Sequence, residues 1–93
     1  MNIVTIDCAG TKSVEEFWDV YLTATLPEGR AQFGRNHGAF WDAVSAGGPG
    51  WPGENCELRF INTTSIKGFR EGSFYEALKE IATRSEWVRI YVE

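Results

Sequence analysis

The sequence predicts an α/β fold, a small three-stranded parallel sheet covered by three to four helices. Segments with the pattern of strands occur near the start, in the middle and at the end of the chain. Between them lie segments whose apolar residues recur at helical spacing. Helices between successive strands favour parallel pairing with right-handed crossovers. At 93 residues the chain is long enough for one hydrophobic core and too short for two, so we expect a single domain, 1–93.

The first strand is predicted at residues 3–8, a short and mostly apolar run. A helix should follow at about 13–24, where valine, aromatic residues and leucine recur at helical spacing. Ser13 is a suitable N-cap and has Glu16 three residues further on, the pattern of a capping box. The segment 25–32 contains proline and glycine and is expected to be a loop.

The second helix is predicted at about 37–46, with Asn36 as its N-cap. Residues 46–53 are rich in glycine and proline, a composition that supports neither helix nor strand. The second strand is predicted at 56–61, where apolar and polar residues alternate.

The last third of the chain is expected to hold a helical turn, a helix and a strand. The turn falls within 63–69. The apolar stripe of the helix runs from Phe74 to Ile81, and the helix should end near Thr83. The segment 87–92 has the pattern of the last strand.

Composition and charge narrow the classes of function. Hydrophobic residues make up 43% of the chain and charged residues 24%, as in an ordinary globular protein. The net charge of -4 argues against nucleic-acid binding, which needs a basic surface, and permits a basic partner. No apolar run approaches the roughly 20 residues that cross a bilayer, and no secretory signal is recognisable. We therefore expect a cytoplasmic protein that binds neither membrane nor nucleic acid.

The two cysteines, Cys8 and Cys56, are expected to be buried free thiols. One closes the first predicted strand and the other opens the second. In a parallel pair they would lie at opposite ends, roughly 16 Å apart at about 3.3 Å per residue, which is beyond the reach of a disulfide. Their spacing does not match a metal site, and only one histidine is present to help.

The second predicted helix has an unusual outer face. On a helical wheel its apolar stripe centres on Phe40 and Val44, and Asp42 lies about 200° from Phe40, almost directly away from the core. Trp41 flanks this aspartate and is expected to face water. On the helical wheel, only small residues lie between these two side chains. A partner could therefore approach the helix backbone closely there. The alternative is that Asp42 is an ordinary solvated residue and Trp41 packs under the following loop.

The same segment resembles a known signature. Phe33-Gly34-x-Asn36-x-x-Ala39-Phe40-Trp41-Asp42 is similar to the YGxNxxALWD motif of the barstar family, intracellular inhibitors of microbial ribonucleases. Leu26-Pro27-Glu28 is similar to the LPE that precedes that motif, with three extra residues here. The predicted order of elements also resembles that family along essentially the whole chain.

The resemblance implies a function and a set of contact residues. The motif aspartate, Asp42 here, would enter the active site of a guanyl-specific ribonuclease in place of a substrate phosphate. Gly34 and Asn36 would place the helix, and Glu80 matches an outlying acidic contact, although it could equally pair with Arg84. The residues expected to contact the partner are Gln32, Gly34, Arg35, Asn36, Gly38, Trp41, Asp42, Ser45, Trp51 and Glu80.

The chain departs from that family's pattern at three of these positions. Gly38 stands in place of an acidic contact, Gln32 in place of a tyrosine and Arg35 in place of a glutamate. The binding face is therefore less acidic, which favours a ribonuclease with a less basic rim, such as one of the Sa type, over barnase itself. We expect a monomer that binds its target one-to-one.

Other functions have weaker support. His37 is the only histidine, and its place near the apolar stripe favours a packing or capping role over catalysis. Glu76 and Glu80 lack His or Cys partners for a metal. No catalytic constellation is present, so we expect no enzyme activity, no cofactor, no metal and no small-molecule substrate. The main alternative is a regulatory interaction module of the same fold whose partner is not a ribonuclease.

Overall fold

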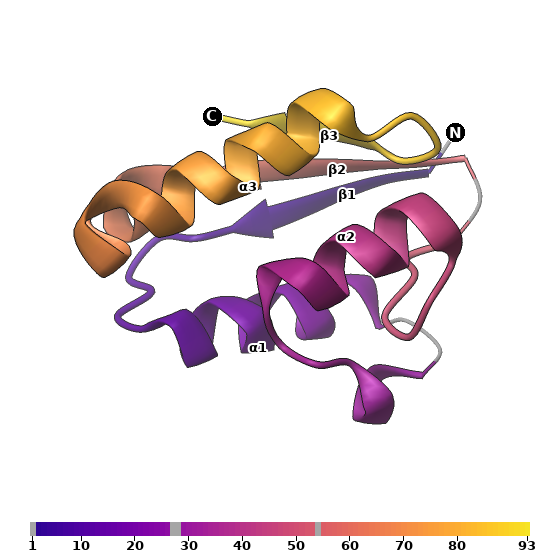
Figure 1. Ribbon diagram of the computed structural model, residues 1–93. Coiled ribbons are helices and arrows are strands. Elements are labelled where there is room, and N and C mark those ends of the chain that lie inside the picture. Colours follow the sequence, from indigo (N-terminus) through magenta and orange to yellow (C-terminus); the bar gives the residue numbers. More distant parts are fainter. Residues whose placement is uncertain (1, 27–28, 54) are drawn as a thin grey trace.

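The computed structural model describes residues 2–26, 29–53 and 55–93 (Figure 1). Strands β1 (Asn2–Asp7), β2 (Cys56–Ile61) and β3 (Arg89–Val92) form one sheet in the order β1-β2-β3. Both pairings are parallel, with Val4 opposite Leu58 and Leu58 opposite Ile90. The predicted α/β fold with a three-stranded parallel sheet is thus confirmed.

Among the described residues, three α-helices and three short 3-10 helices connect the strands. The α-helices are α1 (Val14–Thr25), α2 (His37–Ala46) and α3 (Ser73–Arg84). The 3-10 helices are η1 (Arg30–Gln32), η2 (Thr63–Ile66) and η3 (Phe69–Gly72). The predicted bounds of α2 and β2 are confirmed, and those of α1, α3 and β1 differ by about one residue. Part of the predicted loop at 25–32 forms η1, while Pro27 and Glu28 lie outside the described residues.

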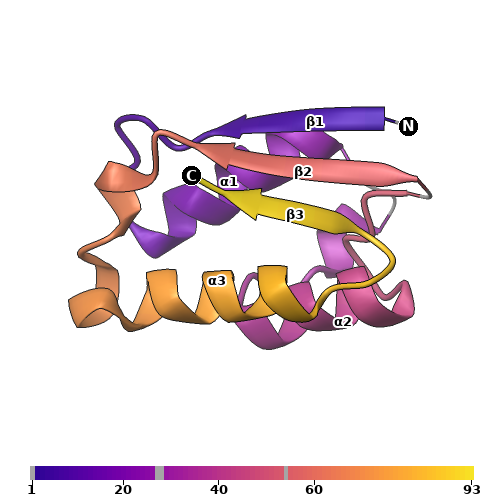
Figure 2. The ribbon, with the colours of Figure 1, turned by 90° about the horizontal axis from the view of Figure 1, so that it is seen from above.

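The helices cover one face of the sheet, not both. The strand residues Ile6, Leu58 and Phe60 are buried on the face that the helices cover. Ile3 and Tyr91 lie on the opposite face and are about half exposed. Figure 2 looks onto that opposite face and shows no helix in front of the strands. The reason is the strand order: two successive right-handed crossovers that advance in the same direction place their helices on the same side.

The core between sheet and helices is rich in aromatic side chains. Phe17 of α1 stacks on Phe60 of β2, with ring centroids 5.5 Å apart, and meets Trp18 and Phe74 edge-on. Phe40 brings α2 into the same cluster through an edge-to-face contact with Tyr21 at 5.2 Å. Each large ring removes much apolar area from water, so α2 is held firmly against α1 and the sheet.

The prediction for the cysteines is confirmed. Cys56 pairs with Asn2 at the start of β1, and Cys8 follows the end of that strand, so the two thiols lie at opposite ends. Both are buried and free.

The prediction for the last strand is wrong at its first two residues. β3 begins at Arg89, and Trp87 lies in the preceding loop with 65% of its surface exposed. The hydroxyl of Ser85 donates to the carbonyl of Val88 over 2.6 Å, which holds the chain in a turn before the strand starts.

Candidate partner-binding surface

The start of α2 is fixed by Asn36. Its side-chain oxygen accepts the N–H of Ala39 at 2.8 Å, as predicted for an N-cap, and its side-chain nitrogen donates to the carbonyl of Gly34 at 3.1 Å. One side chain therefore ties the helix to the loop before it. Side chains at Gly34 and Gly38 would be crowded, because an added Cβ would lie 3.1 Å from Ala39 Cβ and 3.3 Å from Asn36 Oδ1, respectively.

Asp42 lies on the outer face of this helix, as the wheel predicts. It is exposed, whereas Phe40, Ala43 and Val44 are buried. Its carboxylate lies close to the backbone of Gly48, where an added Cβ would stand only 2.7 Å from Asp42 Oδ2. A glycine at position 48 thus leaves room for the carboxylate at the C-terminal end of α2.

Trp41 was expected to project into water, but it does not. It is half-buried and packs against the edge of the core. The guanidinium of Arg84, from the end of α3, lies over its ring with Cζ 5.2 Å from the ring centroid. Ser45 hydrogen-bonds back to the helix, donating to the carbonyl of Trp41 at 2.5 Å. Trp41 therefore contributes a partly covered ring to the surface, not a free one.

Glu80 is connected to the same cluster. Its Oε1 lies 3.6 Å from Nη1 of Arg84, an i,i+4 pair on α3. Both side chains are about two-thirds exposed, so the attraction is weak. Arg84 thus bridges Glu80 on α3 and Trp41 on α2, two positions that the sequence predicted separately.

Two further predicted positions, Arg35 and Gln32, precede the helix. Arg35 is turned toward α1: its Nη2 donates to Asp19 Oδ1 at 2.5 Å and to the carbonyl of Glu15 at 3.0 Å. Its charge is therefore partly neutralised within the chain. Gln32 is exposed at the end of η1. Both positions remain predicted contacts.

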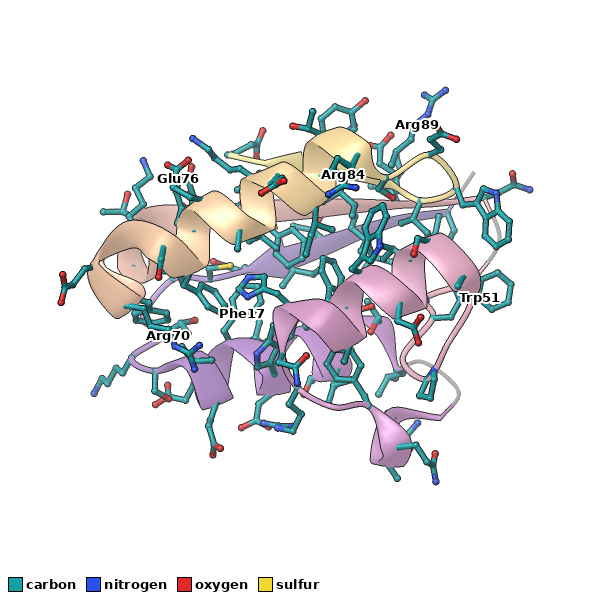
Figure 3. The ribbon with its side chains drawn as sticks, in the orientation of Figure 1. Phe17, Trp51, Arg70, Glu76, Arg84 and Arg89 are labelled. Carbon is teal, nitrogen blue, oxygen red and sulfur yellow. The ribbon has the colours of Figure 1, made fainter. Side chains whose placement is uncertain are left out.

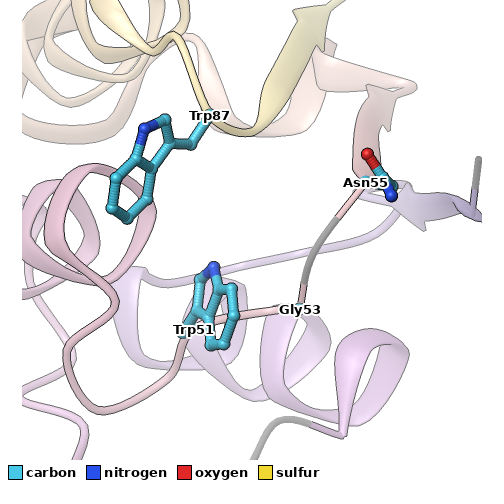
Figure 4. Close-up of a pocket in the computed structure, with 4 residues that line it drawn as sticks. All are labelled: Trp51, Gly53, Asn55 and Trp87. Atoms are coloured by element: carbon cyan, nitrogen blue, oxygen red, sulfur yellow. The ribbon is translucent and has the colours of Figure 1, made fainter.

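Two adjacent pockets extend this surface toward the α3–β3 loop. One, of about 330 Å³, is lined by Trp51, Gly53, Asn55 and Trp87 (Figure 4). The other, of about 310 Å³, is lined by Trp41, Ser45, Arg84, Glu86 and Trp87. Trp87 borders both pockets. Figure 3 shows Trp51 beyond the C-terminal end of α2 and Arg84 near the end of α3.

Sequence reasoning missed Arg84, Glu86 and Trp87 as members of this surface. One signal was present in the alternating run at 87–92. Trp87 falls on the same side of this alternation as Arg89 and Tyr91, which are exposed. Val88 and Ile90, on the other side, are buried. That position marks Trp87 as an outward-facing tryptophan.

His37 has the packing role that the wheel favoured. Its ring lies 4.4 Å from that of Phe74 and 5.6 Å from that of Trp18. Burial, aided by the charge of Arg70, lowers the pKa of His37, and the nearby backbone of Phe74 acts in the opposite direction.

Within residues 2–26, 29–53 and 55–93, no group of three or more His, Cys, Asp or Glu residues could hold a metal ion. Over the same residues, no helix is long and apolar enough to span a bilayer.

No protein-family model matches this chain, and no match was found among characterised protein sequences.

Proposed function

We propose that this protein inhibits a guanyl-specific microbial ribonuclease, binding one-to-one and blocking the active site with the carboxylate of Asp42. The observation that carries the proposal is the position of Asp42. It is an exposed acid on a capped helix whose opposite face is buried, within a segment that resembles the barstar signature. The α/β fold with three parallel strands is compatible with that resemblance.

The chemistry of inhibition follows from the substrate. A ribonuclease cleft presents Arg, Lys and His side chains to bind phosphate, and these groups also form charge-assisted hydrogen bonds with a carboxylate. A carboxylate on a helix cannot undergo the transesterification that cleaves RNA. The mimic would therefore occupy the site without being consumed. Because α2 is anchored by Phe40 and Asn36, little conformational entropy would be lost when Asp42 binds.

The charges around Asp42 favour a ribonuclease with a moderately basic rim. Gly38 adds no acid to this helix face, and Arg35 is already paired with Asp19. The outlying acids among the described residues are Glu80, which is paired with Arg84, and Glu86. This pattern suits a target of the Sa type better than barnase, whose inhibitor has a more acidic face by the resemblance described above.

The decisive experiment titrates the purified protein into ribonucleases of the Sa and barnase types while RNA cleavage is followed. We expect stoichiometric loss of activity at nanomolar protein for at least one Sa-type enzyme, and weaker inhibition of barnase. Full activity of every enzyme at micromolar protein would overturn the proposal. Partner capture would then test the interaction-module alternative.

A further inference from the structure

The pocket between Trp51 and Trp87 is the feature of this surface that the Asp42 mechanism does not use. Trp51 is half-buried in the α2–β2 loop, and Trp87 is 65% exposed in the α3–β3 loop. Figure 4 shows both indoles, and Asn55 is a polar residue among the described residues of the lining. Tryptophan is enriched at the hot spots of protein interfaces, so two tryptophans beside one pocket favour a contact with a protein partner.

Its size and lining limit what the pocket can hold. About 330 Å³ is at the small end of ligand pockets, so it suits a single side chain better than a cofactor or a nucleotide. Tryptophan faces attract cations through the negative potential of the ring. Of the described residues that line the pocket, none is Arg84 or Arg89, the two arginines near Trp87 in the sequence.

The neighbouring pocket already contains the corresponding contact. There the guanidinium of Arg84 lies over Trp41 at 5.2 Å, and the acid Glu86 lies in the same lining as Trp87. An arginine head group therefore fits against an indole in a pocket that shares Trp87 with the pocket at Trp51. The net charge of -4 favours approach of a basic partner.

We propose that the pocket between Trp51 and Trp87 receives an arginine side chain from the rim of the protein partner. The inference rests on the proposed function only for the identity of that partner, since a phosphate-binding cleft carries basic residues at its edge. Asp42 and this pocket would then engage two separate cationic groups of one target.

The test uses the protein alone, with N-acetyl-argininamide as probe and N-acetyl-citrullinamide as its neutral counterpart of nearly the same shape. The indole N–H signals of the four tryptophans are followed by ¹⁵N NMR. We expect saturable shifts of Trp51 and Trp87 with a Kd on the order of tens of millimolar for the arginine probe, and binding at least about fivefold weaker for citrulline. The signal of buried Trp18 should not move. Equal responses to the two probes, or no saturable response, would overturn the inference.

Two substitutions separate attraction by the ring from simple apolar contact. Trp87→Phe keeps an aromatic face, whereas Trp87→Leu keeps apolar bulk without one. Because Trp87 is largely exposed, both variants should fold, which their thermal unfolding checks. We expect the phenylalanine variant to retain binding within about threefold and the leucine variant to lose at least about fivefold. Unchanged binding by Trp87→Leu, or tighter binding of N-acetyl-phenylalaninamide than of the arginine probe, would refute a cation site.

Failure here and failure of the proposed function are distinguishable. Ribonuclease inhibition that depends on Asp42 without any response to the arginine probe would leave the inhibitor proposal standing and remove the pocket. Specific arginine binding in a protein that inhibits no ribonuclease would support the pocket and redirect the search to another basic partner.

Discussion

Arg84 at the end of α3 lies over the ring of Trp41 on α2, with its Cζ 5.2 Å from the ring centroid. The same guanidinium reaches Glu80 at 3.6 Å. One side chain therefore connects an acid on α3 to the tryptophan beside Asp42, although the two helices are separated by a strand and two 3-10 helices in the sequence. The half-buried state of Trp41 is partly a result of this contact.

Replacing Arg84 should expose Trp41 without unfolding the protein. Arg84→Gln removes a cation–π contact and a largely exposed ion pair, each typically contributing less than about 1 kcal/mol. We expect the indole N–H signal of Trp41 to shift and the thermal midpoint to fall by only a few degrees. Arg30→Gln, at an exposed arginine in η1, is the matched control. An indole N–H shift of Trp41 that is the same in Arg84→Gln as in the wild type would show that the contact is not formed in solution.

The role of Asp42 predicts a loss of inhibition with the fold intact. Asp42→Ala removes an exposed carboxylate, so the free energy of unfolding should change by no more than about 0.5 kcal/mol. Affinity for the ribonuclease should fall at least about 30-fold, as for an interface hot spot, mainly through faster dissociation. Surface plasmon resonance measures both rates. Glu76→Ala, another exposed acid, controls for net charge, and similar losses from both variants would contradict a specific role for Asp42.

The contact between Asp42 and Gly48 gives a subtler test of the same mechanism. An added Cβ at position 48 would stand 2.7 Å from Asp42 Oδ2, so Gly48→Ala should force the carboxylate into another rotamer. We expect about tenfold weaker inhibition, because a carboxylate aimed elsewhere loses its charge-assisted hydrogen bonds. Gly68→Ala is the control, since a Cβ there meets nothing within 4 Å. Undiminished inhibition by a correctly folded Gly48→Ala protein would mean that the rotamer of Asp42 does not matter.

Local signals explain why much of the fold could be predicted. The bounds of α2 follow from neighbours in the sequence: Asn36 caps its start, and Gly47 ends it with φ 74°. Strand β2 is flanked by similarly clear breaks. The one-sided covering of the sheet was missed because it depends on strand order, which no single segment encodes. The start of β3 was placed too early because the alternating pattern at 87–92 extends beyond the residues that pair with β2.

The candidate surface, like the fold, could be predicted where local sequence determines it and not where it depends on how separate elements pack. The exposure of Asp42 follows from helical periodicity around the buried Phe40, and it was predicted. The cover over Trp41 depends on how α3 packs beside α2, and neither helix reveals that arrangement alone. The pocket at Trp87 likewise needs two loops to meet, one after α2 and one after α3.

Burial of the thiols predicts that they are chemically silent in the folded protein. Burial, with a smaller contribution from the charge of Asp7, raises the pKa of Cys8 to about 11, and burial also raises the pKa of Cys56. Both thiols should therefore be protonated at pH 8 and inaccessible to reagent. Ellman's reagent should titrate neither cysteine in the native state and both in denaturant. Fast labelling of the native protein at either position would contradict this packing.

The single histidine predicts how stability depends on pH. An unfolded His37 would have a pKa of about 6.5, whereas in the fold burial and the charge of Arg70 lower it. Below pH 6.5 the unfolded chain therefore binds more protons than the folded one, so stability falls as the pH drops toward the lowered pKa and levels off beneath it. Above about pH 7 His37 is neutral in both the folded and the unfolded state, so its protonation no longer lowers the free energy of unfolding.

Protonation is also unfavourable on structural grounds, because Nε2 of His37 is buried without a hydrogen-bond partner among the described residues. The Cε1–H signal of this only histidine should give its folded pKa directly by NMR, and urea unfolding from pH 5 to 8 should give the slope. Arg70→Gln removes the nearby positive charge, so we expect it to raise the pKa and flatten the slope. His37→Phe should remove this part of the pH dependence, and an unchanged slope in that variant would assign the effect to other groups.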